Sequence, residues 1–159
     1  MAQLDEVSRL LTSNQMTIAV AEADTCGLIG YLLGSMPGAS RYFPGGVIAY
    51  ANSVKLGVLG VSNEAVIQGS VSPQMALAMA EGVRRLLDTD LGISDTGIAG
   101  PTGGTFEKPV GLFYVAISTR DGYQKVQEHR WGGGRDQNKR KAAEAALDLA
   151  LRYLKPSYC

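Results

Sequence analysis

The sequence predicts an α/β protein, a three-layer α/β/α sandwich built on a mixed β-sheet. Early in the chain, apolar runs of strand character alternate with stretches of helical periodicity, which favours parallel strands joined by helices. Later, strand-like runs at 111–119 and 124–131 flank the turn DGY, which favours an antiparallel hairpin. The 159 residues are 45% hydrophobic and 19% charged, which suits one packed unit, so we expect a single domain over residues 1–159.

The first half of the chain is expected to alternate helices and strands. The first helix is predicted by apolar residues at helical spacing, Leu4, Val7, Leu10 and Leu11. The apolar, β-branched run MTIAVAEA is typical of a central strand, and GGVIAYAN predicts a second strand. The expected order is a helix at 2–13, a strand at 16–23, a helix at 26–35, a strand at 45–52 and a short helix at 53–59.

The second half begins with a strong helix start, because Ser72 can cap the helix and Pro73 fits its first position. The apolar stripe of this helix is expected to be Met75, Met79, Val83 and Leu86. The final helix should place on one face Ala143, Leu147, Ala150 and Leu154. The expected order is a helix at 72–87, a strand at 91–100 running into a glycine loop, strands at 111–119 and 124–131, and a helix at 135–154.

Charge and cysteine content exclude several classes of protein. Fifteen basic and 15 acidic residues give a net charge of zero, which argues against a nucleic-acid partner. The apolar runs are too short for a membrane span and no signal-like segment opens the chain, so no membrane partner is expected. Two cysteines, Cys26 and Cys159, are too few for a disulfide framework, which favours a cytoplasmic location. His129 has no partner at metal spacing, so no metal is expected, and no cofactor is inferred.

Four loops at strand ends are candidates for a functional site. In open α/β sheets, ligands bind outside the carboxyl ends of the strands. The first three loops follow strands, so we expect them to lie on one rim of the sheet. The loops cover residues 21–27, 50–55, 97–109 and 132–136.

The loop GIAGPTGGTFEKPVG at 97–111 is the richest of the four. Its glycines leave backbone amides uncovered, and such a turn can bind a phosphate or an oxyanion. It is neither a P-loop nor a dinucleotide fingerprint, because the lysine spacing and the following helix are absent. A plain surface loop is the alternative. The candidate substrate-binding residues here are Gly97, Gly100, Thr102, Gly103 and Gly104.

Two further segments of the chain offer charged or polar groups. In YANSVK, Tyr50, Asn52 and Lys55 follow a strand, and a lysine desolvated there can act as a base; the alternative is a solvated surface lysine. In GGGRD, Arg135 lies at a helix start, where amides and a guanidinium suit an anion. The following residues Lys139, Arg140 and Lys141 are expected to form a solvated face.

Taken together, these segments resemble the CinA C-terminal domain family, whose characterised members are nicotinamide-nucleotide amidases. The resemblance implies an α/β/α fold and a homo-oligomer, most simply a dimer. It implies hydrolysis of nicotinamide mononucleotide to nicotinic acid mononucleotide and ammonia without a metal. The matching stretches are AE-x-x-T-x-GL at 21–28, PG-x-S-x-YF at 37–43, G-x-x-x-Y-x-N-x-x-K at 46–55, LGV at 59–61, GSVSP at 69–73, GIAGPTGGTFEKPVG at 97–111 and GGRD at 133–136.

The resemblance breaks at the nucleophile. Tyr50 and Lys55 match the family's positions for activating a serine, and Glu22 and Asn52 are candidate substrate-binding residues. The family writes its first motif AESCTGG, whereas this chain reads AEADTCG, so Ala23 stands at the serine position. Alanine has no oxygen with which to attack, and loss of such a nucleophile can cost on the order of a millionfold in turnover.

Four interpretations follow from this motif. The favoured one is a relative that keeps a nucleotide pocket but has lost the amidase step. The second is an amidohydrolase with a rebuilt mechanism, in which Cys26, Thr25, or a water activated by Asp24 or Glu22 attacks. The third is a different reaction on a related nucleotide, and the fourth is a non-catalytic interaction subunit. Cys26 can also be a small buried thiol, which is the commoner case.

Overall fold

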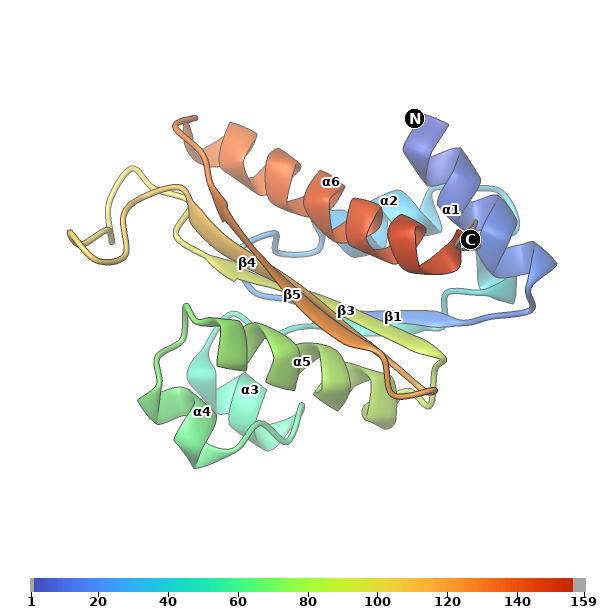
Figure 1. Cartoon of the computed structure of the whole chain (residues 1–159), viewed down its shortest axis with the longest axis horizontal. Helices are drawn as coiled ribbons and strands as arrows, with labels where there is room; N and C mark the ends of the chain where they lie inside the picture. The colour runs from blue at the N-terminus through green and yellow to red at the C-terminus, as the bar shows by residue number, and fades with distance from the viewer. Residues whose placement is uncertain (1, 156–159) are drawn as a thin grey trace.

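A mixed five-stranded sheet forms the middle of the molecule (Figure 1). The structure, a computed structural model, describes residues 2–155, so Cys159 lies outside the described residues. The strand order is β2-β1-β3-β4-β5. Strands β2, β1 and β3 are parallel, β4 is antiparallel to β3, and β5 is antiparallel to β4. The strands are β1 (Ile18–Glu22), β2 (Gly45–Ile48), β3 (Leu91–Gly97), β4 (Leu112–Thr119) and β5 (Gln124–Arg130).

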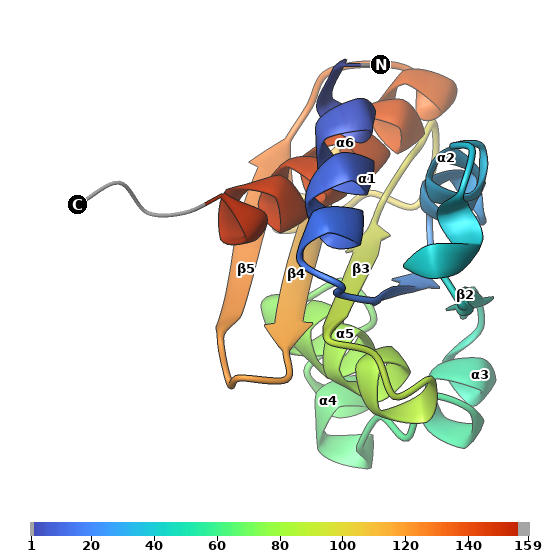
Figure 2. The same cartoon turned by 90° about the vertical axis from the view of Figure 1, so that its right-hand side faces the viewer.

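Helices cover both faces of this sheet, so the predicted three-layer architecture with a mixed sheet is confirmed (Figures 1 and 2). One layer contains α1 (Ala2–Ser13), α2 (Leu28–Gly34) and α6 (Arg135–Leu154). The other contains α3 (Asn52–Gly57), α4 (Asn63–Ile67) and α5 (Pro73–Leu86). Among residues 2–155, no helix is both long and apolar enough to cross a bilayer.

The alternation of side chains along β1 divides the core into two halves. Ile18 and Val20 pack with buried residues of α1, α2 and α6, whereas Ala19 and Ala21 pack with residues of α5 such as Met75. Small residues on this second face let α5 approach closely. At Gly92, an added Cβ would lie 2.1 Å from the carbonyl oxygen of Ala80.

Most of the expected apolar stripes are buried. The residues predicted for the first and last helices are all buried, as are the first three of the stripe on α5. Leu86 is an exception, because it is 49% exposed at the last residue of α5. The sequence reading also missed α4 and the 3₁₀ turn at Ala39–Arg41, which are too short to show a helical period.

All four candidate loops lie along the edge of the sheet that is formed by the ends of its strands, not along an edge strand. The parallel strands β1, β2 and β3 end there, which confirms that the first three loops share a rim. β4 runs against β3 and β5 runs against β4, so β5 also ends at this edge, directly before the GGGRD loop. We call this edge the carboxyl rim.

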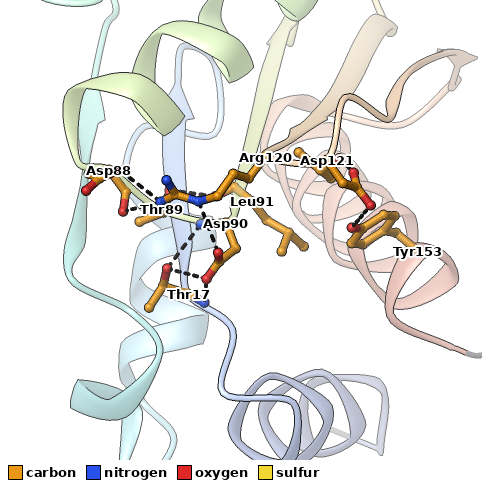
Figure 3. A network of polar contacts seen from close by, with 9 residues as sticks. Thr17, Asp88, Thr89, Asp90, Leu91, Arg120, Asp121 and Tyr153 are labelled. Atoms are coloured by element: carbon orange, nitrogen blue, oxygen red, sulfur yellow. Dashed lines mark hydrogen bonds and ion pairs between the residues drawn. The ribbon is translucent and has the colours of Figure 1, made fainter.

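A surface network around Arg120 lies at the opposite end of the strands, where the parallel strands β1 and β3 begin (Figure 3). The guanidinium donates to the carboxylates of Asp88 and Asp90 at 2.9 and 3.2 Å. Asp90 also accepts bonds from the backbone N–H and the hydroxyl of Thr17. The network therefore ties the turn after β4 to the segments that precede β3 and β1.

Candidate functional site at the carboxyl rim

The turn after β1 is held by the buried carboxylate of Glu22. Its oxygens accept the backbone N–H groups of Gly27, Ile29 and Gly30 at 2.9, 3.0 and 2.7 Å. These groups belong to the first turn of α2, whose N–H donors have no partner inside the helix. The turn that Glu22 closes contains two left-handed residues, Cys26 with φ 51° and Gly27 with φ 98°.

A second buried carboxylate, that of Asp95 on β3, binds the same turn from the neighbouring strand. Asp95 accepts the backbone N–H groups of Ala23, Asp24 and Thr25 at 3.0–3.1 Å. Glu22 and Asp95 are direct partners in the register of β1 and β3, so their side chains lie side by side on one face of the sheet. Residues 23–27, which we call the β1 turn, are thus fixed between two carboxylates.

Burial perturbs the acid–base behaviour of Asp95. Desolvation raises the pKa of this carboxyl from 3.8 to about 7, and the nearby charges of Glu22 and Asp24 raise it further, against a lowering by hydrogen bonds from Thr25. A carboxyl of this kind exchanges its proton near neutral pH.

Lys55 is buried on α3, so the alternative of a solvated lysine is wrong. Only 3% of the residue is exposed, and its ammonium donates to the amide oxygen of Asn52 at 3.4 Å. Desolvation lowers the pKa of the ammonium, although the negative charges of Asp24 and Asp95 oppose this shift. Ala23 belongs to a buried apolar cluster against which Val54, the neighbour of Lys55 in sequence, also packs.

Asp24 connects the β1 turn with the glycine loop and with α6. Its carboxylate accepts the backbone N–H of Ala99 at 2.9 Å, and its backbone carbonyl accepts a hydrogen bond from the ammonium of Lys139. Desolvation raises the pKa of Asp24, whereas the Ala99 N–H and the charges of Lys139, Arg135 and Lys55 lower it. Lys139 therefore belongs to the site, and its expected place on a solvated face is corrected.

Arg135 joins α6 to two other loops of the rim. Its guanidinium donates to the carbonyl of Gly100 at 2.9 Å and to the hydroxyl of Tyr50 at 3.4 Å. Behind it, the buried amide of Asn138 donates to the carbonyls of Ala99 and Gly133. The glycine loop is thus attached to α6 at its first residues.

Several candidate residues take other places than expected. Thr25 is buried within the β1 turn and Glu22 is buried at the end of β1, and both bind protein groups. A substrate contact of Glu22 stays a prediction. Cys26 is exposed and precedes α2, so it is not a buried thiol. At Gly97, an added Cβ would lie 2.3 Å from the ring of Phe113, so this glycine serves packing. The remaining glycine-loop candidates are exposed: Thr102, Gly103 and Gly104.

Sequence reasoning missed Asp95, Asn138 and Ser70. Ser70 donates its hydroxyl to the amide oxygen of Asn52 at 2.8 Å, beside the bond from Lys55. The missed signal is clearest for Asp95, because it is the one charged residue in the strand LGISDTG. A charge inside a buried strand is rarely tolerated unless it is paired or bonded.

The arrangement combines cations with desolvated groups and backbone donors. Lys55, Lys139 and Arg135 surround Asp24, and the β1 turn and the glycine loop meet beside them. Within residues 2–155 there is no group of three metal-ligating side chains. Such a site can bind an anion and can perturb the acidity of a bound group.

Fold and site define a class: an α/β/α protein with a charged site at the carboxyl ends of its parallel strands. The chain belongs to the CinA C-terminal domain family, whose profile matches residues 2–154. It is 48% identical over 155 residues to a protein described as competence-damage inducible from Halothermothrix orenii, and 47% identical over 151 residues to a CinA-like protein from Thermosynechococcus vestitus. These matches cover 97% and 93% of the chain but only 38% and 36% of the two relatives.

Solved structures agree with this assignment. A competence/damage inducible protein from Agrobacterium tumefaciens superimposes with a TM-score of 0.89 at 35% identity, covering 96% of this chain and 95% of that one. A CinA superfamily protein from Klebsiella pneumoniae gives a TM-score of 0.91 at 25% identity, with 96% of both chains covered. The family resemblance inferred from the motifs is therefore confirmed.

Proposed function

We propose that the carboxyl rim binds nicotinamide mononucleotide or a close relative, and that the amidase step is lost or altered. The observation that carries this proposal is the burial of Lys55 beside a β1 turn that lacks a serine. A desolvated ammonium costs free energy unless it has a use or a partner. The hydrogen bond from this ammonium to the amide oxygen of Asn52 is long, at 3.4 Å, and therefore weak. The ammonium is thus available to a ligand.

The charges at the rim suit the phosphate of a mononucleotide. Arg135 is exposed, and the two hydrogen bonds described above join it to neutral groups, the Gly100 carbonyl and the Tyr50 hydroxyl. Its planar guanidinium can exchange these partners for two phosphate oxygens. The neighbouring glycine loop supplies backbone N–H groups for the same anion or for the carboxamide oxygen.

The β1 turn argues against direct nucleophilic attack from its own side chains. Ala23 offers a methyl group that is 4% exposed, and the hydroxyl of Thr25 is bonded to Glu22 and Asp95. Cys26 projects from a left-handed, exposed position. We therefore expect the site to bind the nucleotide, with an amidase turnover on the order of a millionfold below that of a serine-containing relative.

One pair of measurements tests this function. Nicotinamide mononucleotide is expected to raise the melting temperature of the protein, because a ligand that binds only the folded state stabilises it. No ammonia should be released by the natural chain, whereas Ala23→Ser should release it. Absence of any thermal shift, together with no ammonia from either protein, would contradict the proposal.

A matched pair of variants on α6 localises the binding. Arg135→Ala should weaken nucleotide binding about tenfold or more, since a charge-assisted bond to phosphate is lost. Arg140→Ala is the control, because Arg140 pairs with Asp136 on the same helix at 2.8 Å and is exposed. Equal affinities of the two variants would place the phosphate elsewhere.

A rebuilt amidohydrolase is the second candidate, favoured by the position of Asp24. Its partly buried carboxyl has a raised pKa because of desolvation, and Lys55 and Lys139 flank it. Such a group can take a proton from an attacking water. Ammonia release by the natural chain that disappears in Asp24→Asn would establish this candidate in place of the binding protein.

Oligomerisation belongs to the same proposal, and apolar residues at the rim are consistent with it. Ile48, Tyr50 and Phe106 are exposed by 53%, 55% and 101%. Exposed apolar side chains near a site often mark contacts with a partner. We propose a homodimer, which light scattering coupled to gel filtration would distinguish from a monomer.

A further inference from the structure

The hydroxyl of Thr25 lies between two carboxyl groups. Its oxygen is 2.6 Å from Oε2 of Glu22 and 2.5 Å from Oδ1 of Asp95. A hydroxyl carries one hydrogen, so it can donate to one of these oxygens and not to both. The second short contact requires a hydrogen on the carboxyl group itself, which then donates to the hydroxyl oxygen.

The lengths of the backbone bonds indicate which carboxyl group carries that hydrogen. Hydrogen bonds to a charged acceptor are shorter than those to a neutral one. The N–H bonds to Glu22 measure 2.7, 2.9 and 3.0 Å, whereas those to Asp95 measure 3.0, 3.1 and 3.1 Å. The extra proton therefore belongs on Asp95, and the order of donation runs from Asp95 to Thr25 to Glu22.

The charges that face Asp95 support this assignment. Glu22 from β1 and Asp24 from the β1 turn repel a negative charge there, and Lys55 from α3 attracts one. From α6, the cations Lys139 and Arg135 act on Asp24.

The other neighbours of Asp95 contribute no opposing charge. On β4, its register partner is Val115. α5 packs on the opposite face, where Ser94 donates to the Ala76 carbonyl, so the sheet separates Asp95 from the charged groups of that helix: Glu81, Arg84 and Arg85. α2 carries no charged residue.

We propose that Asp95 is a positioning residue whose protonated carboxyl, bonded through Thr25 to Glu22, holds the β1 turn in its binding conformation. When Asp95 loses its proton, the Thr25 hydroxyl can serve only one of two adjacent carboxylates, and the turn loosens. Ala23 and Asp24 move with it, since their N–H groups bind Asp95. The site is thus assembled at slightly acidic pH and relaxed at alkaline pH.

The first test needs no ligand and no variant. Carboxyl-carbon NMR of the free protein should show Asp95 titrating near pH 7, so that about nine in ten Asp95 side chains are protonated at pH 6. Asp90 is the internal control, because hydrogen bonds from Thr17 and Arg120 outweigh its partial burial and lower its pKa. A titration midpoint for Asp95 below about pH 5 would overturn the proposal.

The second test asks whether the proton acts on binding, and this part rests on the proposed function. The affinity for nicotinamide mononucleotide should fall at least several-fold between pH 6 and pH 8 in the natural chain and in Thr25→Ser. In Asp95→Asn this dependence should be smaller, since the amide keeps a donor toward Thr25 at every pH. The phosphate of the ligand titrates equally in all three proteins, so the comparison removes its effect.

The outcomes separate the two proposals. Identical pH profiles in the natural chain and Asp95→Asn would overturn the positioning role. If no protein binds the nucleotide, the proposed function fails, and the NMR titration alone still decides whether Asp95 holds the proton.

Discussion

The two ends of the parallel strands carry the same kinds of side chain, which are buried at the carboxyl rim and partly exposed at the opposite end. At the carboxyl rim, Asp95 is fully buried, and desolvation raises its pKa to about 7. At the opposite end, partial burial acts on Asp90 in the same direction, but bonds from Thr17 and Arg120 outweigh it and lower the pKa. Desolvation therefore lets Asp95 exchange a proton near neutral pH, whereas hydrogen bonds keep Asp90 charged there.

The energetic consequences differ as well. Removing one partner from a buried, bonded group leaves its neighbours without partners, which is expensive. An exposed ion pair such as Arg120–Asp88 is screened by water, and Asp88 is 87% exposed at its side chain. The carboxyl rim should therefore dominate both stability and pH dependence.

The largest effect is expected from Asp95→Ala. The change leaves three backbone N–H groups and the Thr25 hydroxyl with fewer partners in a dry site, so the free energy of unfolding should fall by about 3 kcal/mol or more. Urea unfolding at pH 6 measures this loss. A decrease below about 1 kcal/mol would show that water enters and replaces the carboxyl group.

The pH dependence of stability should differ in sign between the two ends of the strands. The folded pKa of Asp95 is raised, so its contribution is fully present below the unfolded value near 3.8 and is lost as the pH rises through about 7. The folded pKa of Asp90 is lowered, so its contribution is present above the unfolded value and lost as the pH falls through the folded one. Urea unfolding between pH 5 and pH 8 should slope downward, Asp95→Asn should flatten it and Asp90→Asn should not. An unchanged slope in Asp95→Asn would contradict this assignment.

A moderate effect is expected from Asp90→Ala. The bonds that Asp90 accepts from the Thr17 backbone and hydroxyl are 2.8 and 2.9 Å long and partly buried, so their loss should cost about 1 kcal/mol. Denaturant titration would measure it. A loss as large as that of Asp95→Ala would remove the distinction between the two ends of the strands.

The smallest effect is expected from Asp88→Asn, which removes the charge but keeps a residue that tolerates the left-handed φ of 50° at this position. Its carboxylate is exposed and its pairing with Arg120 is screened, so the unfolding curve in urea should coincide with that of the natural chain. Repeating the measurement in 1 M salt is the control, since salt should weaken the pair further without changing this result.

The sequence predicted the architecture well because the packing obeys simple periods. Buried stripes such as Leu4, Val7 and Leu11 repeat at helical spacing, and the strands follow as apolar runs between turn signals. Leu86 shows the limit of this reasoning: it satisfies the period of α5, but the helix ends there and leaves the side chain exposed.

The site was only partly predictable. Lys55, Tyr50 and Arg135 follow strands or start a helix, so the rule that ligands gather at carboxyl ends identified them. Asp95 lies inside a strand, and its contact with the β1 turn depends on the register between β1 and β3. That register pairs residues 73 positions apart, which no local pattern encodes.

The exposed thiol of Cys26 gives the β1 turn a natural attachment point for a reporter. It is the one cysteine among residues 2–155, and it lies one residue from Thr25. A maleimide fluorophore coupled there would sense changes in the environment of the β1 turn. With Cys159 replaced by serine, so that Cys26 alone can react, opening and closing of this segment could be followed in real time from the emission of a single dye.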